Sequence, residues 1–460
     1  MDLFRRSADQ TTQAGSTAIR QIGNLRYMNI VQITPGAGGM YCGNCFRDNA
    51  LVEALRKLGH ETLMVPLYLP MTLDDADQSA GTPIFFGGIN VYLDQQSPAF
   101  RKAPRWLRNV FSHPKLLKWA SGRAAKTRAS DLGELTVSML RGEEGHQVAE
   151  LDTLISWLKE QSRPEVVCLS NALLIGLARR IKHELGCTVV CNLQGEDAFL
   201  DGLSEPHGTA AWQVLTQRCD DVDLFIAPSR YFGDLMGRRL KLDGQRVRVL
   251  YNGIKLDGFS PAAAPPKPPV LGFFARMCRE KGLDTLVDAF LILKTRERTQ
   301  DLRLHVGGSL GPADEPFVAR LQQKLAAHKE SFQFFPNVSL AEKQEFYRLL
   351  SVLSVPALYG EAFGLYVIEA LASGVPVVQP SVAAFPELIE KTGGGLLCDP
   401  DNPGALADAI EILVVDTIRA RAMGGAGREA VLQDFTADAM ARNFVELVSS
   451  RRLPAAQAHA

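Results

Sequence analysis

The chain has 460 residues and a formal net charge of -1, with 46% hydrophobic and 22% charged residues. This composition is ordinary for a soluble globular protein and does not indicate a general nucleic-acid binder. The length exceeds what one ordinary core holds, so two domains of about 200 residues each are expected. No apolar run approaches the roughly 18 residues of a membrane-spanning helix.

The two ends of the chain are polar. Residues 1–27 lack the apolar core of a signal peptide. We expect a flexible arm at 1–27, a disordered tail at 451–460 and a cytoplasmic protein. Peripheral attachment to the inner membrane face stays open as an alternative.

The first half alternates apolar runs with amphipathic helical patterns. A strand at 29–34, a helix at 48–58 and a strand at 61–65 predict a β-α-β unit with a parallel sheet. Residues 28–255 are therefore expected to form one Rossmann-like domain. Its further strands are predicted at 166–169, 188–193, 224–227 and 247–251.

A proline-rich stretch at 261–269 cannot continue a helix or a central strand, so 256–269 is predicted to be a linker. The alternation then restarts and predicts a second Rossmann-like domain at 270–435. Its expected strands are 270–274, 302–307, 332–335, 354–356 and 375–379, with helices at 282–293, 315–328, 341–350 and 364–373.

The predicted fold class is α/β, with two doubly wound domains that face a central cleft. Ligands of such folds bind at the carboxyl ends of the strands. A helical pattern at 437–448, within a closing segment 436–450, is expected to pack back toward the first domain.

Two carboxylates flank a predicted helix start in the second domain. The helix begins near Gly364, with Glu361 just before it and Glu369 about one and a half turns inside. Free amides at a helix N-terminus suit an anion, and carboxylates accept hydrogen bonds from sugar or ribose hydroxyls. The alternative is a capping Glu361 and a solvated Glu369, which fits Glu369 poorly because this position borders an apolar face.

Cations follow the first strand of the same domain. Arg276 and Lys281 come after a buried strand, and Gly282 leads into a helix. This pattern suits a pyrophosphate, although a solvated loop of mixed charge is an equal alternative.

A glycine-rich loop follows the first strand of the chain. Gly38 and Gly39 lie in it, but Tyr41 breaks the dinucleotide-binding pattern G-x-G-x-x-G. Either a phosphate cradle or a flexible turn fits this loop.

Cysteines are spread over both halves. Cys42 and Cys45 form a C-x-x-C without further zinc ligands, so local packing is favoured over a metal or redox role. The cysteines in or beside apolar runs are expected to be reduced and mostly buried: Cys168, Cys187, Cys191, Cys278 and Cys398.

Together, Glu361-x7-Glu369, Arg276-x4-Lys281, the Gly38-Gly39-Met40 loop and Pro386-Glu387 resemble the retaining GT-B enzymes of glycosyltransferase family 4. The resemblance runs from about residue 28 to 450. It implies transfer of a sugar from a UDP-, GDP- or ADP-linked donor to an acceptor that the sequence does not identify. It also implies retained anomeric configuration and no cofactor or required metal.

The resemblance implies a role for each candidate residue. Glu361 would hold sugar hydroxyls near the reacting carbon, and Glu369 would accept the ribose hydroxyls. The leaving phosphate would take the acceptor's proton, so positioning and charge stabilisation would supply most of the catalysis. The remaining donor contacts would be Arg276 and Lys281 on the diphosphate, Gly38 and Gly39 closing on it from the other domain, the backbone of Phe363, Gly364 and Leu365 on the sugar and phosphate, and the loop that ends at Val338 on the base.

One position departs from the family pattern. Many relatives carry a His after the strand at 188–193, where this chain has Gln194. Gln194 can hydrogen-bond a hydroxyl but cannot titrate. Glu196 and Asp197 follow it, and either they face the acceptor or they cap a helix.

The family resemblance places the acceptor on the first domain, residues 28–255. Residues 85–92 of this domain have a faint similarity to bacterial glycogen synthases, which suggests an α-glucan acceptor without establishing it. A basic cluster near Trp106 suits a phosphorylated or lipid-linked acceptor, and a solvated helix face is the favoured alternative. Other functions on the same fold are a sugar phosphorylase, an epimerase, or a nucleotide-sugar-binding protein without catalysis.

Overall fold

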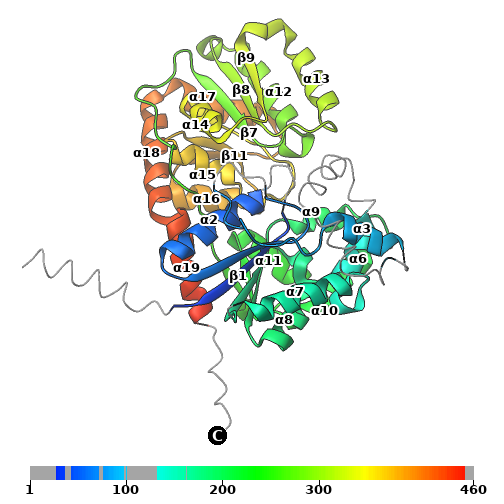
Figure 1. Cartoon of the computed structure of the whole chain (residues 1–460). Coiled ribbons are helices and arrows are strands. Elements are labelled where there is room, and N and C mark those ends of the chain that lie inside the picture. Colours follow the sequence, from blue (N-terminus) through cyan, green and yellow to red (C-terminus); the bar gives the residue numbers. More distant parts are fainter. Residues whose placement is uncertain are drawn as a thin grey trace, which may run out of the picture.

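The computed structural model describes residues 27–36, 43–71, 76–97, 100, 132–161 and 163–450. Gly38, Gly39, Cys42 and the basic cluster near Trp106 lie outside these residues, as do the predicted tail and all of the predicted arm except Tyr27. Two six-stranded parallel sheets with covering helices form two lobes (Figure 1). No helix within the described ranges is long and apolar enough to cross a membrane.

The first sheet has the strand order β2-β1-β3-β4-β5-β6. Its strands are β1 Asn29–Thr34, β2 Glu61–Pro66, β3 Val166–Leu169, β4 Thr188–Asn192, β5 Leu224–Ala227 and β6 Val247–Val249. Helices cover both faces, which explains why β3 and β5 are continuous apolar runs. These helices are α2 Gly43–Lys57, α3 Gly88–Gln96, α6 Gly133–Arg141, α7 Val148–Glu160, α8 Ala178–Leu185, α9 Glu196–Asp201, α10 His207–Arg218 and α11 Arg230–Arg239.

The second sheet has the strand order β12-β11-β10-β7-β8-β9. Its strands are β7 Val270–Phe274, β8 Arg303–Gly308, β9 Phe332–Pro336, β10 Val352–Leu353, β11 Val377–Pro380 and β12 Gly395–Cys398. The helices that follow β7 onward are α12 Leu283–Lys294, α13 Glu315–Lys324, α14 Leu340–Arg348, α15 Leu365–Ala372, α16 Phe385–Thr392, α17 Pro403–Val415, α18 Thr417–Asp434 and α19 Ala437–Ser449.

Several predicted bounds were wrong. The strand expected at 354–356 is β10, which ends at Leu353, and the helix expected to start at residue 48 begins at Gly43. The helix expected to reach residue 328 ends at Lys324 and passes into a 3-10 segment. Strand β12 and helices α16, α17 and α18 were not predicted.

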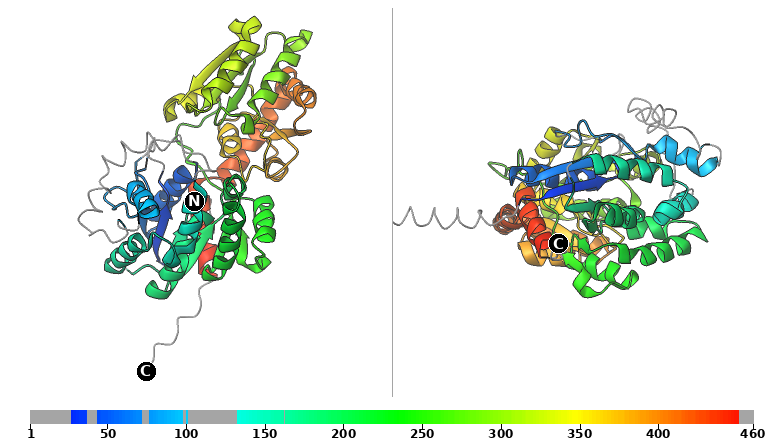
Figure 2. Two further views of the ribbon diagram at one scale, coloured as in Figure 1. Left: turned by 90° about the vertical axis from the view of Figure 1, so that its right-hand side faces the viewer. Right: turned by 60° about the horizontal axis from the view of Figure 1, so that its bottom comes forward.

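The closing helix packs on the first sheet, as predicted. Phe444 and Met440 of α19 share one core cluster with Ile30 of β1 and Leu51 of α2. The segment that leads into α19 lies beside Ile254, in the connection between the two sheets. The Ile254 amide donates to the Phe435 carbonyl (2.9 Å), and the Ala437 amide donates to the Ile254 carbonyl (2.9 Å). Figures 1 and 2 show α18 running along the second lobe toward the first, and α19 lying beside β1 and α2.

We predict that Phe444→Ala lowers the free energy of unfolding by about 3–5 kcal/mol, because Phe444 is fully buried in the first lobe's core. Urea unfolding followed by circular dichroism measures the change. Asn443→Ala, an exposed position on the same helix, is the matched control. Equal midpoints for the two variants would show that α19 does not stabilise the first lobe.

Candidate functional site

Glu361 lies in a buried polar cluster just before α15. Its Oε2 atom accepts hydrogen bonds from Lys281 Nζ (2.5 Å), the Tyr366 hydroxyl (3.0 Å) and the Tyr359 hydroxyl (3.3 Å). The Lys281 and Glu361 side chains are only 18% and 13% exposed. Two residues predicted separately therefore form one ion pair, and Glu361 is not the helix cap of the alternative interpretation.

The charges of this pair reinforce each other. Burial raises the pKa of Glu361, but Lys281 and the two hydroxyls outweigh burial and hold that pKa below its usual range. Burial likewise lowers the pKa of Lys281, while Glu361 and Tyr359 produce a net rise. Both partners are therefore charged at neutral pH. Among the described residues, none donates a hydrogen bond to the other carboxylate oxygen, Oε1.

Two backbone turns bring the pair together. Gly282 has a φ of 72°, and a Cβ there would lie 1.9 Å from the Pro356 carbonyl oxygen. Only glycine lets the loop that carries Lys281 come this close to the segment before Glu361. Gly364, with a φ of 90°, is the N-cap from which α15 starts.

Glu369 points toward α14. Its Oε1 atom lies 2.6 Å from Lys343 Nζ, and its Oε2 atom accepts a hydrogen bond from the Tyr347 hydroxyl (2.9 Å). The Lys343 and Glu369 side chains are 7% and 13% exposed, so the solvated interpretation of Glu369 was wrong. Lys343 and Tyr347 were missed, although their i, i+4 spacing places them on one helix face.

Arg276 is paired away from Glu361. Its guanidinium makes a two-pronged contact with Asp314, with Nε to Oδ2 at 2.8 Å and Nη2 to Oδ1 at 3.2 Å. Hydrogen bonding to Asp314 raises the pKa of Arg276 further. Arg276 is 59% exposed and remains open to a ligand, whereas Lys281 is largely enclosed. The role of Asp314 had no signal in the sequence.

Gln194 follows β4 in the first lobe, and its Oε1 atom accepts a hydrogen bond from Asn252 (3.2 Å). The backbone amide of Gln194 donates to Glu196 Oε2 (2.5 Å), and the backbone amide of Ala172 donates to Glu196 Oε1 (3.3 Å). Glu196 is buried, and burial raises its pKa to about 7 against the opposing effect of these amides. Glu196 thus ties two loops together, while the half-buried Asp197 has a pKa raised by burial.

The two lobes meet beside these residues. A Cβ on Gly195 would lie 3.8 Å from Ala362, and a Cβ on Gly43 would lie 3.6 Å from Leu365. Gly43 is the first described residue after the glycine loop, so α2 starts against the first residue of α15. The structure therefore brings the Gln194 loop and the Glu361 segment into proximity.

The remaining predicted positions are more peripheral. The Phe363 ring is buried against Tyr251 and Phe435 at centroid distances of 6.5 and 6.2 Å, so its backbone alone can face a ligand. Val338 lies half-buried after β9. The neighbouring Asn337 exchanges two hydrogen bonds with the Leu310 backbone, which ties this loop to the one after β8.

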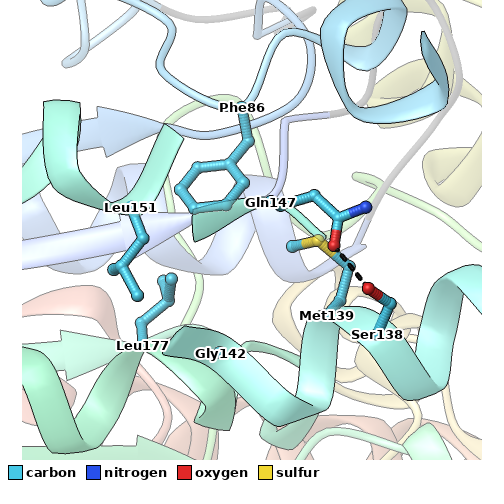
Figure 3. Close-up of a pocket in the computed structure, with 7 residues that line it drawn as sticks. All are labelled: Phe86, Ser138, Met139, Gly142, Gln147, Leu151 and Leu177. Carbon is cyan, nitrogen blue, oxygen red and sulfur yellow. Dashed lines mark hydrogen bonds between the residues drawn. The ribbon is translucent and has the colours of Figure 1, made fainter. Parts of the chain in front are cut away.

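The cysteines of the described ranges are thiols, and one of them, Cys278, lies in the loop between Arg276 and Lys281. The seven cysteines in the described ranges are free and buried, which confirms the prediction for the five in apolar runs and includes Cys45. In the same ranges, no group of three His, Cys, Asp or Glu side chains could hold a metal. A cavity of about 10 Å³ in the first lobe is lined by none of the candidate residues, and Phe86, Leu151 and Leu177 close it beside the Gln147–Ser138 hydrogen bond (Figure 3).

Family models match both halves of the chain. Residues 258–430 match "Glycosyl transferases group 1", and residues 119–257 match "Glycosyltransferase Family 4".

Curated relatives match part of the chain. A D-inositol 3-phosphate glycosyltransferase of Corynebacterium glutamicum is 27% identical over 235 residues, which cover 48% of this chain and 56% of the relative. An alpha-maltose-1-phosphate synthase of Mycolicibacterium smegmatis is 28% identical over 229 residues, which cover 45% and 57%. The chain thus spans little more than half the length of these two relatives.

Solved structures match nearly the whole chain. Sucrose-phosphate synthase from Thermosynechococcus elongatus superposes with a TM-score of 0.68 at 19% identity, covering 92% of this chain and 98% of the other. Anabaena Alr3699/HepE in complex with UDP-glucose gives 0.63 at 15% identity, covering 92% and 100%. At such low identity these matches establish the fold alone.

We predict that Glu196 makes stability fall as pH rises. Its folded pKa, about 7, lies above the ordinary glutamate value of 4.5, so the folded state binds the extra proton between these pH values. Relative to Glu196→Gln, the wild type should lose on the order of 3 kcal/mol of unfolding free energy from pH 4.5 to 8, at about 1.4 kcal/mol per pKa unit. Urea unfolding across this range measures the difference. Parallel curves of unfolding free energy against pH for the wild type and Glu196→Gln would contradict the prediction.

Proposed function

Because the chain belongs to glycosyltransferase family 4 and has the two-lobed GT-B fold, we propose that it is a retaining hexosyltransferase that uses a nucleotide-sugar donor. The observation that carries this proposal is the asymmetric anchoring of Glu361. One carboxylate oxygen holds three donors, while the other has no protein partner among the described residues. A carboxylate fixed in this way can accept hydroxyl hydrogens from a sugar without first being desolvated or reoriented.

Glu369 supplies the proposed ribose contact. Each of its oxygens accepts one interaction from α14, and each retains a lone pair for a ribose hydroxyl. Lys343 and Tyr347 hold the carboxylate in one orientation before the donor arrives. A ribose contact also argues against a sugar phosphorylase, which would use free phosphate.

Lys281 and Arg276 are expected to stabilise the diphosphate in different ways. Lys281 is committed to Glu361 and lends partial positive charge beside the sugar site, whereas the exposed Arg276 carries the freer charge. The helix α15 start adds backbone amides at Gly364 and Leu365. With these groups, the site needs no resident metal to stabilise the leaving group.

The proposed reaction breaks the bond between the anomeric carbon and the phosphate oxygen. The acceptor hydroxyl attacks that carbon from the face that the leaving group occupies, and the departing phosphate oxygen takes the hydroxyl proton. Gln194 hydrogen-bonds the sugar and takes no proton. The contribution of the protein is to position both partners and to stabilise the charge that develops on the diphosphate.

We predict that one of UDP, GDP or ADP raises the unfolding temperature by several degrees, because a ligand at 100 times its Kd stabilises by about 2.7 kcal/mol. Differential scanning fluorimetry identifies the nucleotide, and assays with the matching sugars then measure hydrolysis and transfer.

Glu369→Gln should lower the affinity for that nucleotide at least about tenfold, since a charged hydrogen bond contributes roughly 1.5–3 kcal/mol. Glu330→Gln, an exposed change in the same lobe, should leave it unaltered.

The outcomes separate the alternatives. If no nucleotide binds, the proposed function fails. A nucleotide sugar that binds without turnover would identify a binding protein that lacks catalysis. Wild-type affinity in Glu369→Gln would refute the ribose contact alone.

We predict that Arg276→Ala lowers kcat about 10²- to 10³-fold, which is the usual effect of removing one group that stabilises developing charge. Arg279→Ala is the matched control, because Arg279 lies in the same loop, is 77% exposed and forms a long ion pair with Asp284 (3.6 Å). Steady-state transfer rates measure both. Equal rates for the two variants would show that Arg276 does not support the leaving group.

A further inference from the structure

The N-terminus of helix α11, in the first lobe, is capped by a side chain of the second lobe. Glu387 of α16 accepts hydrogen bonds from two first-turn amides of α11, with Oε1 to the Arg230 amide at 2.9 Å and Oε2 to the Tyr231 amide at 3.2 Å. The third amide, that of Phe232, is capped locally by Ser229 Oγ (3.1 Å). A helix start is usually satisfied by side chains beside it in the chain, whereas here the carboxylate lies 157 residues beyond Arg230.

Glu387 is enclosed by charge and hydrogen bonds. It is 8% exposed, and its Oε1 atom also accepts the Tyr251 hydroxyl (2.8 Å). Burial, and then the bond to Glu387, raise the pKa of Tyr251 to about 12, so this phenol remains a donor. The Arg230 guanidinium lies 3.4 Å away, and the positive end of α11 adds to the attraction.

The same contact reaches the segment that carries Glu361. The Ser229 hydroxyl donates to the Ala362 carbonyl (2.7 Å), and the Ala384 amide at the start of α16 donates to the Glu361 carbonyl (3.3 Å). A Cβ on Gly360 would lie 2.3 Å from the Tyr231 hydroxyl oxygen, so the two segments touch at a glycine. Helix α11, Glu387 and the Glu361 segment therefore form one connected contact between the lobes.

We propose that Glu387 is a positioning residue that joins the start of α11 to the Glu361 segment and so sets the spacing between the lobes for transfer. This inference rests on the proposed function. Glu387 is 8% exposed, and the hydrogen bonds of both its oxygens go to the first lobe, to α11 and Tyr251, which assigns it to the contact between the lobes and not to the donor. Its effect is to keep the acceptor-side lobe, with Gln194, at a fixed distance from Glu361.

Glu387→Gln tests the contact with little change in volume. The amide has one acceptor oxygen, and its NH2 group would face the N–H group that Oε2 accepts in the wild type. Residue-resolved hydrogen exchange should show faster exchange at the Arg230 and Tyr231 amides, by roughly 10- to 100-fold. The Phe232 amide should keep its rate, because its acceptor is Ser229. Glu390→Gln, on the same helix and 81% exposed, is the matched control, because Glu390 lies 3.9 Å from the exposed Arg230 guanidinium and does not accept from the α11 amides.

Kinetics test the positioning role. Glu387→Gln should lower kcat at least tenfold with the donor identified by the nucleotide screen, while affinity for the corresponding nucleotide, measured by calorimetry, stays within twofold of wild type. Unchanged exchange rates of helix α12 amides show that the variant is folded. Glu390→Gln should match the wild type throughout.

Each other outcome overturns part of this assignment. Wild-type exchange at Arg230 and Tyr231 would refute the contact. Faster exchange with an unchanged kcat would refute positioning, and a large loss of nucleotide affinity would place Glu387 in the donor pocket. If the wild type turns over no nucleotide sugar, the proposed function fails and positioning for transfer fails with it, while the exchange result still decides whether the contact exists.

Discussion

The buried ion pair between Lys281 and Glu361 is the interaction on which the second lobe's site depends. Removing one member of such a pair leaves an uncompensated charge and commonly costs about 3–5 kcal/mol. The pair joins segments 80 residues apart in the chain, and both Gly282 and the hydroxyls of Tyr359 and Tyr366 serve to bring it together. Because this pair fixes Glu361 on one side, the other side of the carboxylate is available for recognition. The same principle repeats at Glu369, where α14 supplies the cation and the phenol.

The two lobes contribute different chemistry. The second lobe holds two carboxylates that are already paired with lysines, and the exposed guanidinium of Arg276, which is paired with Asp314; this set suits charge stabilisation. The first lobe offers Gln194 and the carboxyl of Glu196, whose raised pKa reflects burial and whose partners are backbone amides. A division of this kind is what the proposed reaction requires, in which the leaving phosphate takes the proton. It also makes the distance between the lobes an essential quantity, which is why a contact such as that of Glu387 with α11 matters.

Much of the fold could be predicted from periodicity. Val166–Leu169, Leu224–Ala227 and Val270–Phe274 were predicted to the residue, because strands buried on both faces are continuous apolar runs with sharp ends. Strand β10 was misplaced because its two paired residues lie within a longer apolar stretch. In the site, Glu361 and Lys281 were predicted but their pairing was not, since contacts across 80 residues leave no local pattern. Three further pairings were missed for the same reason: Glu369 with Lys343, Arg276 with Asp314, and Glu387 with the start of α11.

Helix α19 completes the first lobe's core although it is the last helix of the described chain. Met28 and Ile30, near the start of that core, pack in the same cluster as Phe444 and Val448. At a synthesis rate of about 5–20 residues per second, Phe444 is therefore made roughly 20–80 s after Ile30. Through that interval the part of the first sheet that α19 covers stays uncovered, although α2 already packs beside it. The lobe that is synthesised first is thus the last to be completed, and nascent chains halted before residue 437 would present that uncovered part to chaperones.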